Sequence, residues 1–346
     1  MKTVQPLLPH FKSFLKDSKS GKRLKKNGEK IREGTIKNYC AVYRNVTLFS
    51  QEKNFDLRIC DANKLTQREF ISEKNYWKKF YKQFTKYLYA NGCHDNYVGT
   101  NVKIIRSLFN YMENEKNIST GGFHKSFYVR KEAIAILVLS PDQLKFLIHD
   151  TTFHQKLTKG EQKIKDMFVF GCTTGLRFSD LMLLNKNNFE KIDGDWYLKI
   201  RSKKTKSFST MKLPEYASDI FLDFRKRYIG RTIFPKISLF NFNKTLKRIG
   251  EKAGYDAPID TSREVLGKLK KASSNKKQLR FCDKMSSHMM RRTAITTMLI
   301  LGMPEHLVRV VSGHSMGGNS FQRYIHYARA YTNTELDKVY AQLESY

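Results

Sequence analysis

The first 125 residues carry an almost unbroken pattern of amphipathic helices, which limits that part of the chain to a helical fold. The stretch 96–113 shows the pattern best, because its apolar residues recur at helical spacing. These residues are Val98, Val102, Ile105, Leu108 and Phe109. Three further helices are predicted at residues 8–15, 35–49 and 72–90. We therefore expect a helical domain over residues 1–125.

The pattern changes after residue 125, and we place a linker at residues 126–139. Ser140 followed by Pro141 is typical of a helix start, because serine caps a helix and proline fits its first turn. A second domain is expected over residues 140–346. The whole chain of 346 residues is long enough for each domain to bury its own core.

The second part of the chain mixes helices and strands. Helices are predicted at 163–172 and 178–184, and strands at 196–201 and 208–213. A lysine-rich turn at 202–207 joins the two strands, and residues 268–280 are expected to form a polar, basic loop. The expected fold class is mainly α with a small antiparallel β-sheet.

Charge is the clearest signal in the composition. The chain has 64 Lys and Arg against 32 Asp and Glu, a formal net charge of +32, which favours a nucleic acid as partner. No apolar run is long enough to span a membrane, and the N-terminus lacks a signal peptide. A bacterial cytoplasmic, nucleoid-associated protein is expected. Five scattered cysteines without a Cys-x-x-Cys pair predict neither a disulfide framework nor a metal site.

Two basic regions of the first part are candidates for contact with a DNA backbone. The segment 19–32 is a basic loop that contains Lys22, Arg23, Lys25 and Lys26, and Thr35 is expected to cap the helix after it. Lys103 and Arg106 lie on the polar face of the helix predicted at 96–113. Both regions also fit an ordinary solvated surface.

Five short segments of the second part carry the side chains that could do chemistry. They are Thr174–Arg177, Lys204–Thr205, His288–Arg291, Gly313–His314, and Tyr324. Together these segments supply two guanidiniums, an ammonium, two imidazoles and a phenol. Such a set could hold one phosphodiester and attack it with a tyrosine.

Each of these side chains also has a structural interpretation. Arg177 could pair with Asp180, His314 could be a core histidine, and Lys204 could belong to a solvated hairpin. His288 and Arg291 have the spacing of one helical face, near a start that Ser287 would cap, where an anion is favoured.

Taken together, the segments resemble the tyrosine recombinases, or phage-type integrases. Thr174–Leu184 looks like the first arginine box of that family, and His288-x-x-Arg291 with Ser312-Gly-His314 and Tyr324 looks like its second box. The nearest likeness is to integrases of bacterial integrative and conjugative elements. The resemblance implies a SAM-like helical core-binding domain and a mixed α/β catalytic domain that together form a clamp around DNA.

The resemblance also implies roles for single residues. Arg177 and Arg291 would hold the scissile phosphate, with His288 and His314 completing the site. Lys204 would be the general acid, with Lys203 and Lys206 as alternatives, and Tyr324 would be the nucleophile. Asp180 would support the site from behind Arg177. The interval from His314 to Tyr324 is one residue longer than is common in the family, which keeps Tyr327 as a second candidate.

The implied reaction is metal-independent cleavage and rejoining of double-stranded DNA through a 3′-phosphotyrosine, without a cofactor. The implied context is integration or excision of a mobile element by a homotetramer on DNA, with an accessory or directionality factor as a further partner. Two alternatives share parts of this pattern. A type IB topoisomerase would relax DNA with the same chemistry, and an inactive accessory protein would bind DNA without cleaving it.

Overall fold

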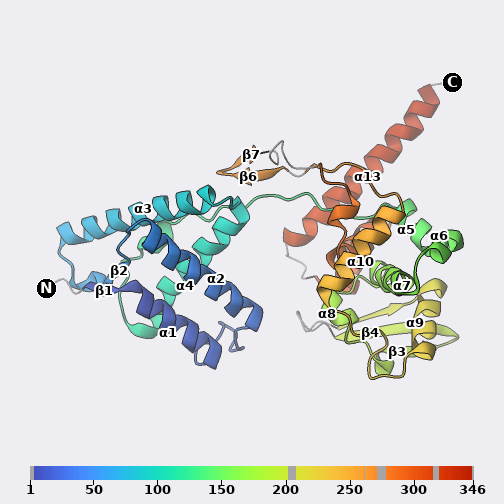
Figure 1. Ribbon diagram of the computed structural model, residues 1–346, viewed down its shortest axis with the longest axis horizontal. Helices are drawn as coiled ribbons and strands as arrows, with labels where there is room; N and C mark the ends of the chain where they lie inside the picture. Colours follow the sequence, from blue (N-terminus) through green and yellow to red (C-terminus); the bar gives the residue numbers. More distant parts are fainter. Residues whose placement is uncertain (1–3, 202–207, 261, 271–277, 315–318, 345–346) are drawn as a thin grey trace. The chain divides into compact units, whose positions relative to one another are not determined.

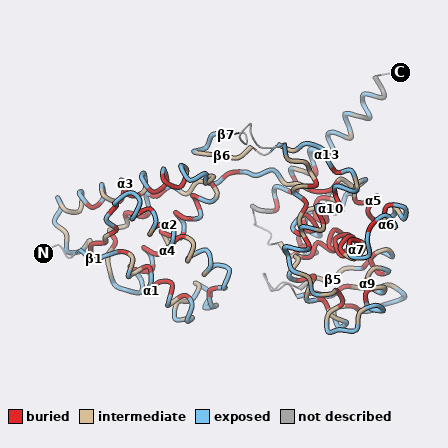
Figure 2. Tube along the Cα trace, in the orientation of Figure 1, coloured by how far each residue is buried: buried red, intermediate tan, exposed pale blue. Residues whose placement is uncertain are grey.

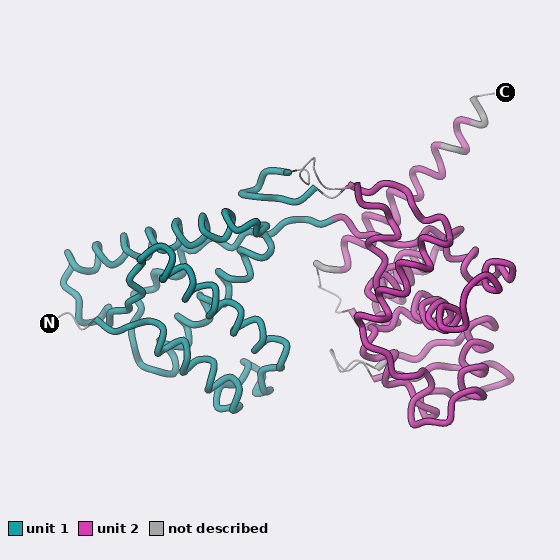
Figure 3. Tube along the Cα trace, in the orientation of Figure 1, with its two compact units in different colours: residues 1–134, 261–274 teal, residues 135–260, 275–346 magenta. Residues whose placement is uncertain are grey.

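A computed structural model describes residues 4–201, 208–260, 262–270, 278–314 and 319–344, and its elements are shown in Figure 1. The chain divides into two compact units (Figure 3). Unit 1 comprises residues 1–134 and 261–274, and unit 2 comprises residues 135–260 and 275–346. Among the described helices, none is both long and apolar enough to cross a membrane.

Unit 1 is built mainly from long helices. These are α1 (Leu7–Ser20), α2 (Glu33–Glu52), α3 (Gln67–Ala90) and α4 (Asp95–Lys116). The strands β1 (Val4–Pro6) and β2 (Arg58–Cys60) pair antiparallel, and η1 (Ala62–Lys64) and η2 (Phe123–Ser126) are short 3-10 helices. All four predicted helices are confirmed, and each is longer than its apolar pattern suggested.

Aromatic side chains fill the core of unit 1. Phe11, Phe14, Phe49, Trp77, Phe80, Phe84 and Phe109 are all fully buried there. Trp77 contacts Phe109 edge-on, with ring centroids 4.7 Å apart. Such edge contacts add stability beyond the burial of apolar area. The prediction that Thr35 caps α2 is wrong, because α2 already begins at Glu33 and the Thr35 amide donates to the Arg32 carbonyl within its first turn.

Unit 2 combines helices with a three-stranded sheet. Its helices are α5 (Pro141–His149), α6 (Thr151–Lys156), α7 (Lys159–Thr174), α8 (Phe178–Leu181), α9 (Glu215–Arg227), α10 (Leu239–Lys252), α11 (Ser287–Ile300), α12 (Glu305–Ser312) and α13 (Asn319–Glu344), with the 3-10 helices η3 (Lys186–Asn188) and η4 (Cys282–Lys284). The sheet has the order β3 (Phe189–Ile192), β4 (Asp195–Arg201), β5 (Phe208–Lys212), and both pairs are antiparallel. The expected fold class is confirmed.

Differences from the predicted elements of unit 2 are local. Both predicted strands form, and β3 joins them as a strand that the sequence reading missed. The helix predicted over 178–184 ends at Leu181, where Met182 is its C-cap. The turn at 202–207, which includes Lys204, lies outside the described residues.

Helix α7 is the buried centre of unit 2 (Figure 2). Its start is fixed by a capping box, in which Thr158 accepts from the Glu161 amide and Glu161 accepts from the Thr158 amide. Its inner face carries Met167, Phe168 and Phe170, which are fully buried, and α11 packs against it. The predicted cap and proline at the start of α5 are confirmed, since Ser140 accepts a hydrogen bond from the Gln143 amide.

One segment departs from the order of the chain. Residues 261–274 lie in sequence between α10 and α11 of unit 2, yet they belong to unit 1 (Figure 3). Here β6 (Arg263–Val265) and β7 (Lys268–Lys270) form an antiparallel hairpin. The loop predicted at 268–280 is therefore wrong for residues 268–270. Residues 271–277 lie outside the described part of the chain.

Candidate active site

The first arginine of the site follows the end of α7. Gly175 terminates this helix with a φ of +66°, a left-handed conformation that glycine adopts without strain, and its amide donates to the Gly171 carbonyl. Two residues later, Arg177 is the N-cap of α8. Its Nη1 lies 4.0 Å from Oδ2 of the buried Asp180. The local turn thus sets Arg177 beside an acidic partner from the next helical turn.

The second arginine, Arg291, is buried on α11 and holds three parts of unit 2 together. Its Nη1 donates to the Gly175 carbonyl at 3.0 Å, and its Nη2 donates to the Ser312 carbonyl. The same Nη2 lies 3.3 Å from Nδ1 of His314. A guanidinium has five N–H donors, more than these three contacts require. Arg291 can therefore brace the site and still donate to an anion.

His314 is held by the turn that ends α12. Gly313 caps this helix with a φ of +61°, and the His314 amide returns to the Arg309 carbonyl at 2.9 Å. The Ser312 hydroxyl lies 2.7 Å from Nδ1 of the same imidazole. Because a guanidinium can only donate, Nδ1 must accept from Arg291, so the proton of the neutral ring is on Nε2. His314 then offers an Nε2–H donor to a ligand.

Tyr324 lies on α13 and is buried in a small apolar cluster with Ile295, Val308 and Phe321. Its ring meets that of His314 at a centroid distance of 5.9 Å, and it meets Phe321 edge-on at the same distance. Phe321 in turn lies under the guanidinium of Arg309, 4.1 Å from its ring centroid. This packing fixes the position of the phenol next to the imidazole.

Electrostatic effects show that these side chains share one environment. Burial, reinforced by the charge of Arg177, lowers the pKa of Arg291 to about 10. Tyr324 and Asp180 act in the opposite direction and raise the pKa of Arg291. Burial and then the charges of Arg291 and Arg177 lower the pKa of His314 to about 4, so its imidazole is neutral near pH 7. The site is a positively charged, partly buried cluster that favours an anion.

A sequence model of the phage integrase family matches residues 138–330, more than half of the chain and the whole of this cluster. The chain belongs to the phage integrase family. The predicted membership in the tyrosine recombinases is thereby confirmed.

Solved structures with a similar fold include three kinds of integrase-family protein. The XerH recombinase bound to a palindromic difH substrate has a TM-score of 0.62 and 15% identity, covering 92% of this chain and 91% of that one. The Tn1549 transposon integrase in complex with circular intermediate DNA has a TM-score of 0.58 and 14% identity, with coverages of 92% and 95%. A lambda integrase tetramer bound to a Holliday junction has a TM-score of 0.60 and 12% identity, with coverages of 93% and 77%. Among curated proteins, no sequence matches this chain.

Five of the residues predicted from the sequence lie in this cluster of unit 2. Hydrogen bonds, an ion pair, a ring contact and electrostatic effects bring together Arg177, Asp180, Arg291, His314 and Tyr324. The sequence reading gave no role to Ser312, although it stands in the Ser-Gly-His segment. Arg309 and Phe321 were also missed, because an arginine and a phenylalanine twelve residues apart form no local pattern.

His288 has a different setting from Arg291. It lies in the first turn of α11 with an exposed side chain, whereas Arg291 is buried. The prediction that Ser287 caps this helix is wrong: Ser287 is its first residue, Ser286 is the N-cap, and the Ser287 amide donates to Oδ1 of Asn243 from α10. The first amide of this helix thus donates to a side chain of a neighbouring helix.

The basic residues predicted to contact DNA are all in unit 1. Lys22, Lys26 and Lys103 are exposed. Arg23 lies over the Phe14 ring at 4.5 Å and pairs with Glu115, and Lys25 pairs with Glu29 at 2.8 Å. Arg106 is half-buried. Two of the four loop cations therefore have contacts within the fold, and contact of this loop with DNA stays a prediction.

No three His, Cys, Asp or Glu side chains in the described part of the chain are arranged to hold a metal ion. The side chains of the site are cationic or neutral donors, apart from the acidic Asp180, which lies beside Arg177. Such donors suit an anionic ligand directly.

The lowered pKa of His314 predicts a change in the stability of the protein with pH. The ordinary value is 6.5 and the folded value is about 4, so between these values only the unfolded chain binds the proton. The free energy of unfolding should therefore decrease as the pH falls from 6.5 toward 4, with no contribution from this residue above 6.5. Urea denaturation across this range should show a weaker decrease in His314→Gln than in the wild-type protein.

The exposed His326 on α13 offers the matched control. His326→Gln should keep the wild-type pH dependence. If His314→Gln also kept it, the imidazole of His314 would not be held neutral by the fold.

Proposed function

We propose that this integrase-family protein is a site-specific DNA recombinase, which cleaves and rejoins double-stranded DNA through a covalent 3′-phosphotyrosine. The observation that carries the proposal is the convergence of Arg177, Arg291, His314 and Tyr324 in one cationic, partly buried cluster. The net charge of +32 supports a nucleic acid as substrate.

In the proposed reaction the phenol of Tyr324 loses its proton to solvent, its oxygen attacks the scissile phosphorus, and the 5′ oxygen of the next nucleotide is displaced. Negative charge then grows on the nonbridging oxygens, where Arg177, Arg291 and the Nε2–H of His314 can donate. Fixed donors of this kind need no reorganisation as the charge develops. The phosphotyrosine keeps the energy of the phosphodiester, so a 5′ hydroxyl can later attack it and rejoin the strand.

Further residues have proposed roles around this step. Lys204 gives a proton to the departing 5′ oxygen, and His288 assists at the phosphate from the first turn of α11. Asp180 orients the guanidinium of Arg177, a role supported by their 4.0 Å ion pair. Tyr324 is favoured over Tyr327 as nucleophile, because Tyr324 packs on His314 and acts on the pKa of Arg291.

The proposed biological setting is the integration or excision of a mobile element in a bacterial cell. The DNA would be a pair of attachment sites, clamped by both units, and an accessory or directionality factor would be a further partner. The basic residues proposed to contact the DNA backbone are Lys22, Arg23, Lys25, Lys26, Lys103 and Arg106. A tetramer is proposed because a lambda integrase tetramer on a Holliday junction is among the similar structures. The exposed Leu336, Val339 and Tyr340 at the end of α13 support docking of that helix on a neighbouring protomer.

Two other functions use the same fold. A type IB topoisomerase would also form a phosphotyrosine but would relax supercoiled DNA of any sequence. An accessory protein with an inactive site would bind DNA and form no covalent product.

One experiment separates these functions. The purified protein is incubated with a pool of nicked duplexes, SDS-stable adducts are isolated, and the DNA ends in them are sequenced. A recombinase should give adducts with one shared sequence and with the protein on the 3′ phosphate. Adducts without sequence preference would favour the topoisomerase, and binding without any adduct would overturn the proposed chemistry.

A further inference from the structure

Unit 2 precedes and follows residues 261–274 in the chain, and of this segment the structure describes residues 262–270, which we call the arm. At the base of the arm two segments of unit 2 pair with each other, since the Ile259 amide donates to the Leu279 carbonyl and the Phe281 amide donates to the Ala257 carbonyl, both at 2.9 Å. The returning segment passes through η4 into α11, the helix of His288 and Arg291. The head of the arm is the β6–β7 hairpin, which is part of unit 1.

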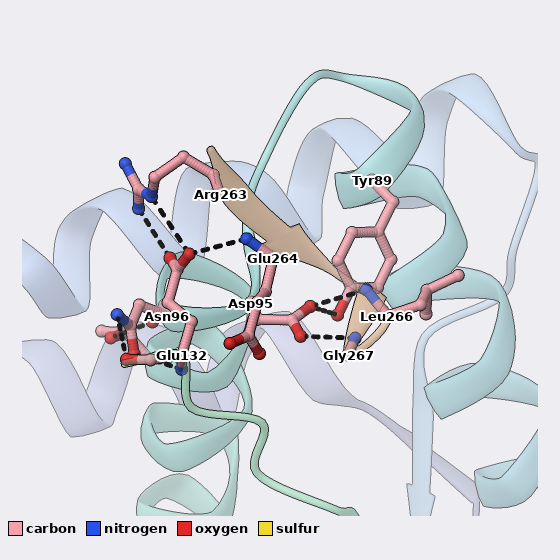
Figure 4. A network of polar contacts seen from close by, with 9 residues as sticks. Tyr89, Asp95, Asn96, Glu132, Arg263, Glu264, Leu266 and Gly267 are labelled. Atoms are coloured by element: carbon pink, nitrogen blue, oxygen red, sulfur yellow. Dashed lines mark hydrogen bonds and ion pairs between the residues drawn. The ribbon is translucent and has the colours of Figure 1, made fainter. Parts of the chain in front are cut away.

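The turn of the hairpin is bound by Asp95 at the start of α4 (Figure 4). One carboxylate oxygen accepts from the Leu266 amide at 2.9 Å, and the other accepts from the Gly267 amide at 2.8 Å. The Tyr89 hydroxyl donates to the first oxygen at 2.6 Å. Asp95 is 1% exposed, so its charge depends on these donors for compensation. Leu266 adopts a φ of +57°, a strained value for this residue that the two bonds to Asp95 hold in place.

A second carboxylate, that of Glu132, binds the first strand of the hairpin (Figure 4). Both of its oxygens accept from the guanidinium of Arg263, at 2.6 and 3.0 Å, and the Glu264 amide donates to it at 2.9 Å. Arg263, in spite of the burial of the carboxylate, holds the pKa of Glu132 down to about 2. The ion pair is therefore fully charged at neutral pH, and bidentate pairs of this kind are among the stronger ones.

Glu132 also lies at the point where the chain first leaves unit 1, which ends at residue 134. Its backbone is fixed by Asn96, whose amide side chain both donates to the Glu132 carbonyl and accepts from the Glu132 amide, each at 3.2 Å. On the far side of the crossing, the Leu139 amide donates to the hydroxyl of Thr293 on α11 at 3.1 Å. The chain thus passes between the units at this crossing and on either side of the arm. Glu132 is bound at both places in unit 1, through its backbone to Asn96 and through its carboxylate to the hairpin.

We propose that Asp95 and Glu132 are positioning residues for DNA cleavage, and that they act by fastening the arm to unit 1. With the arm fastened, unit 1 is tied to the segments that lead directly into α11, so binding of DNA by unit 1 is coupled to the helix that carries Arg291. With the arm released, the first crossing of the chain, between residues 134 and 135, still connects the units. This inference rests on the proposed function for its effect on cleavage, but not for the attachment of the arm.

The attachment is tested first, in the absence of DNA. Hydrogen exchange of the peptide 262–270 should become about tenfold or more faster in Asp95→Asn and in Arg263→Gln, because each variant removes charge-assisted hydrogen bonds from the hairpin. Arg263→Gln leaves the residues of α4 unchanged, so it remains informative even if Asp95→Asn weakens the folding of α4. Asp142→Asn is the matched control, since Asp142 is an exposed acid in the first turn of α5. Unchanged exchange in Arg263→Gln would overturn the attachment.

The effect on the reaction is tested with saturating protein on a site recovered by the adduct experiment. In Arg263→Gln the rate of adduct formation should fall about fivefold or more, while DNA affinity changes about twofold or less. The reason is that the variant loses the coupling between DNA binding by unit 1 and α11, and not the DNA contacts themselves. Arg263→Lys, which keeps the charge, should recover part of the rate. A released hairpin with an unchanged adduct rate would overturn the positioning role. Absence of adducts with the wild-type protein would overturn the proposed function instead, and the exchange result would stand.

Discussion

Tyr324→Phe is expected to abolish the covalent protein–DNA adduct, with a loss of about 10⁴-fold or more, because phenylalanine has no oxygen to attack the phosphorus. The ring itself should stay in place, since its contacts with His314 and Phe321 involve the aromatic faces and edges. Thermal unfolding and DNA binding should therefore remain close to those of the wild-type protein. The measurement is the amount of SDS-stable adduct formed on a nicked site, beside a gel-shift assay of binding.

Tyr327→Phe is the matched control, because Tyr327 lies one helical turn further on α13 and is half-buried. It should form adducts at nearly the wild-type rate. Adducts that persist in Tyr324→Phe and vanish in Tyr327→Phe would transfer the role of nucleophile to Tyr327. Such a result would agree with the longer interval after His314, where residues 315–318 lie outside the described part of the chain.

Arg291→Lys is expected to give the second largest loss, about 10²- to 10³-fold in the rate of adduct formation. A lysine keeps the charge but has one nitrogen, which cannot reach the Gly175 carbonyl, the Ser312 carbonyl and His314 as the guanidinium does. A buried carbonyl left without its donor should also lower the free energy of unfolding by about 1–3 kcal/mol. Single-turnover adduct formation and urea denaturation measure the two effects separately.

Two arginines provide comparisons for this variant. Arg292→Lys changes the next residue on α11, which is half-buried, and should leave most of the activity. Arg177→Lys should lose activity as Arg291→Lys does, but with a smaller loss of stability, because Arg177 is less buried. If Arg291→Lys formed adducts within about threefold of the wild-type rate, the guanidinium would not hold the phosphate in the transition state.

Much of the fold could be predicted because helix formation leaves local marks in a sequence. Apolar residues at helical spacing located α4, and the cap at Ser140 marked where α5 begins. Some predictions failed where a helix end uses a partner that is distant in sequence. The start of α11 is an example, since its first amide, that of Ser287, donates to Asn243 of α10.

The candidate site was predictable in its residues but not in its interactions. The two glycine turns at Gly175 and Gly313 are local, and Arg177 follows the first by two residues while His314 follows the second directly. The neutral state of His314 depends instead on burial and on the charges of Arg291 and Arg177, which come from other elements. The bond from Arg291 to Gly175 joins residues 116 positions apart, a separation at which spacing carries no information.

By itself, the sequence determined where the helices of this protein form and which side chains could meet a phosphate, because periodicity, capping and motif spacing are properties of neighbouring residues. Only the tertiary structure decided which atoms of those side chains donate, that the imidazole of His314 is neutral, and that the arm inserted before α11 belongs to unit 1. Those outcomes depend on desolvation and on hydrogen bonds between distant segments, such as Asp95 with Leu266 and Glu132 with Arg263.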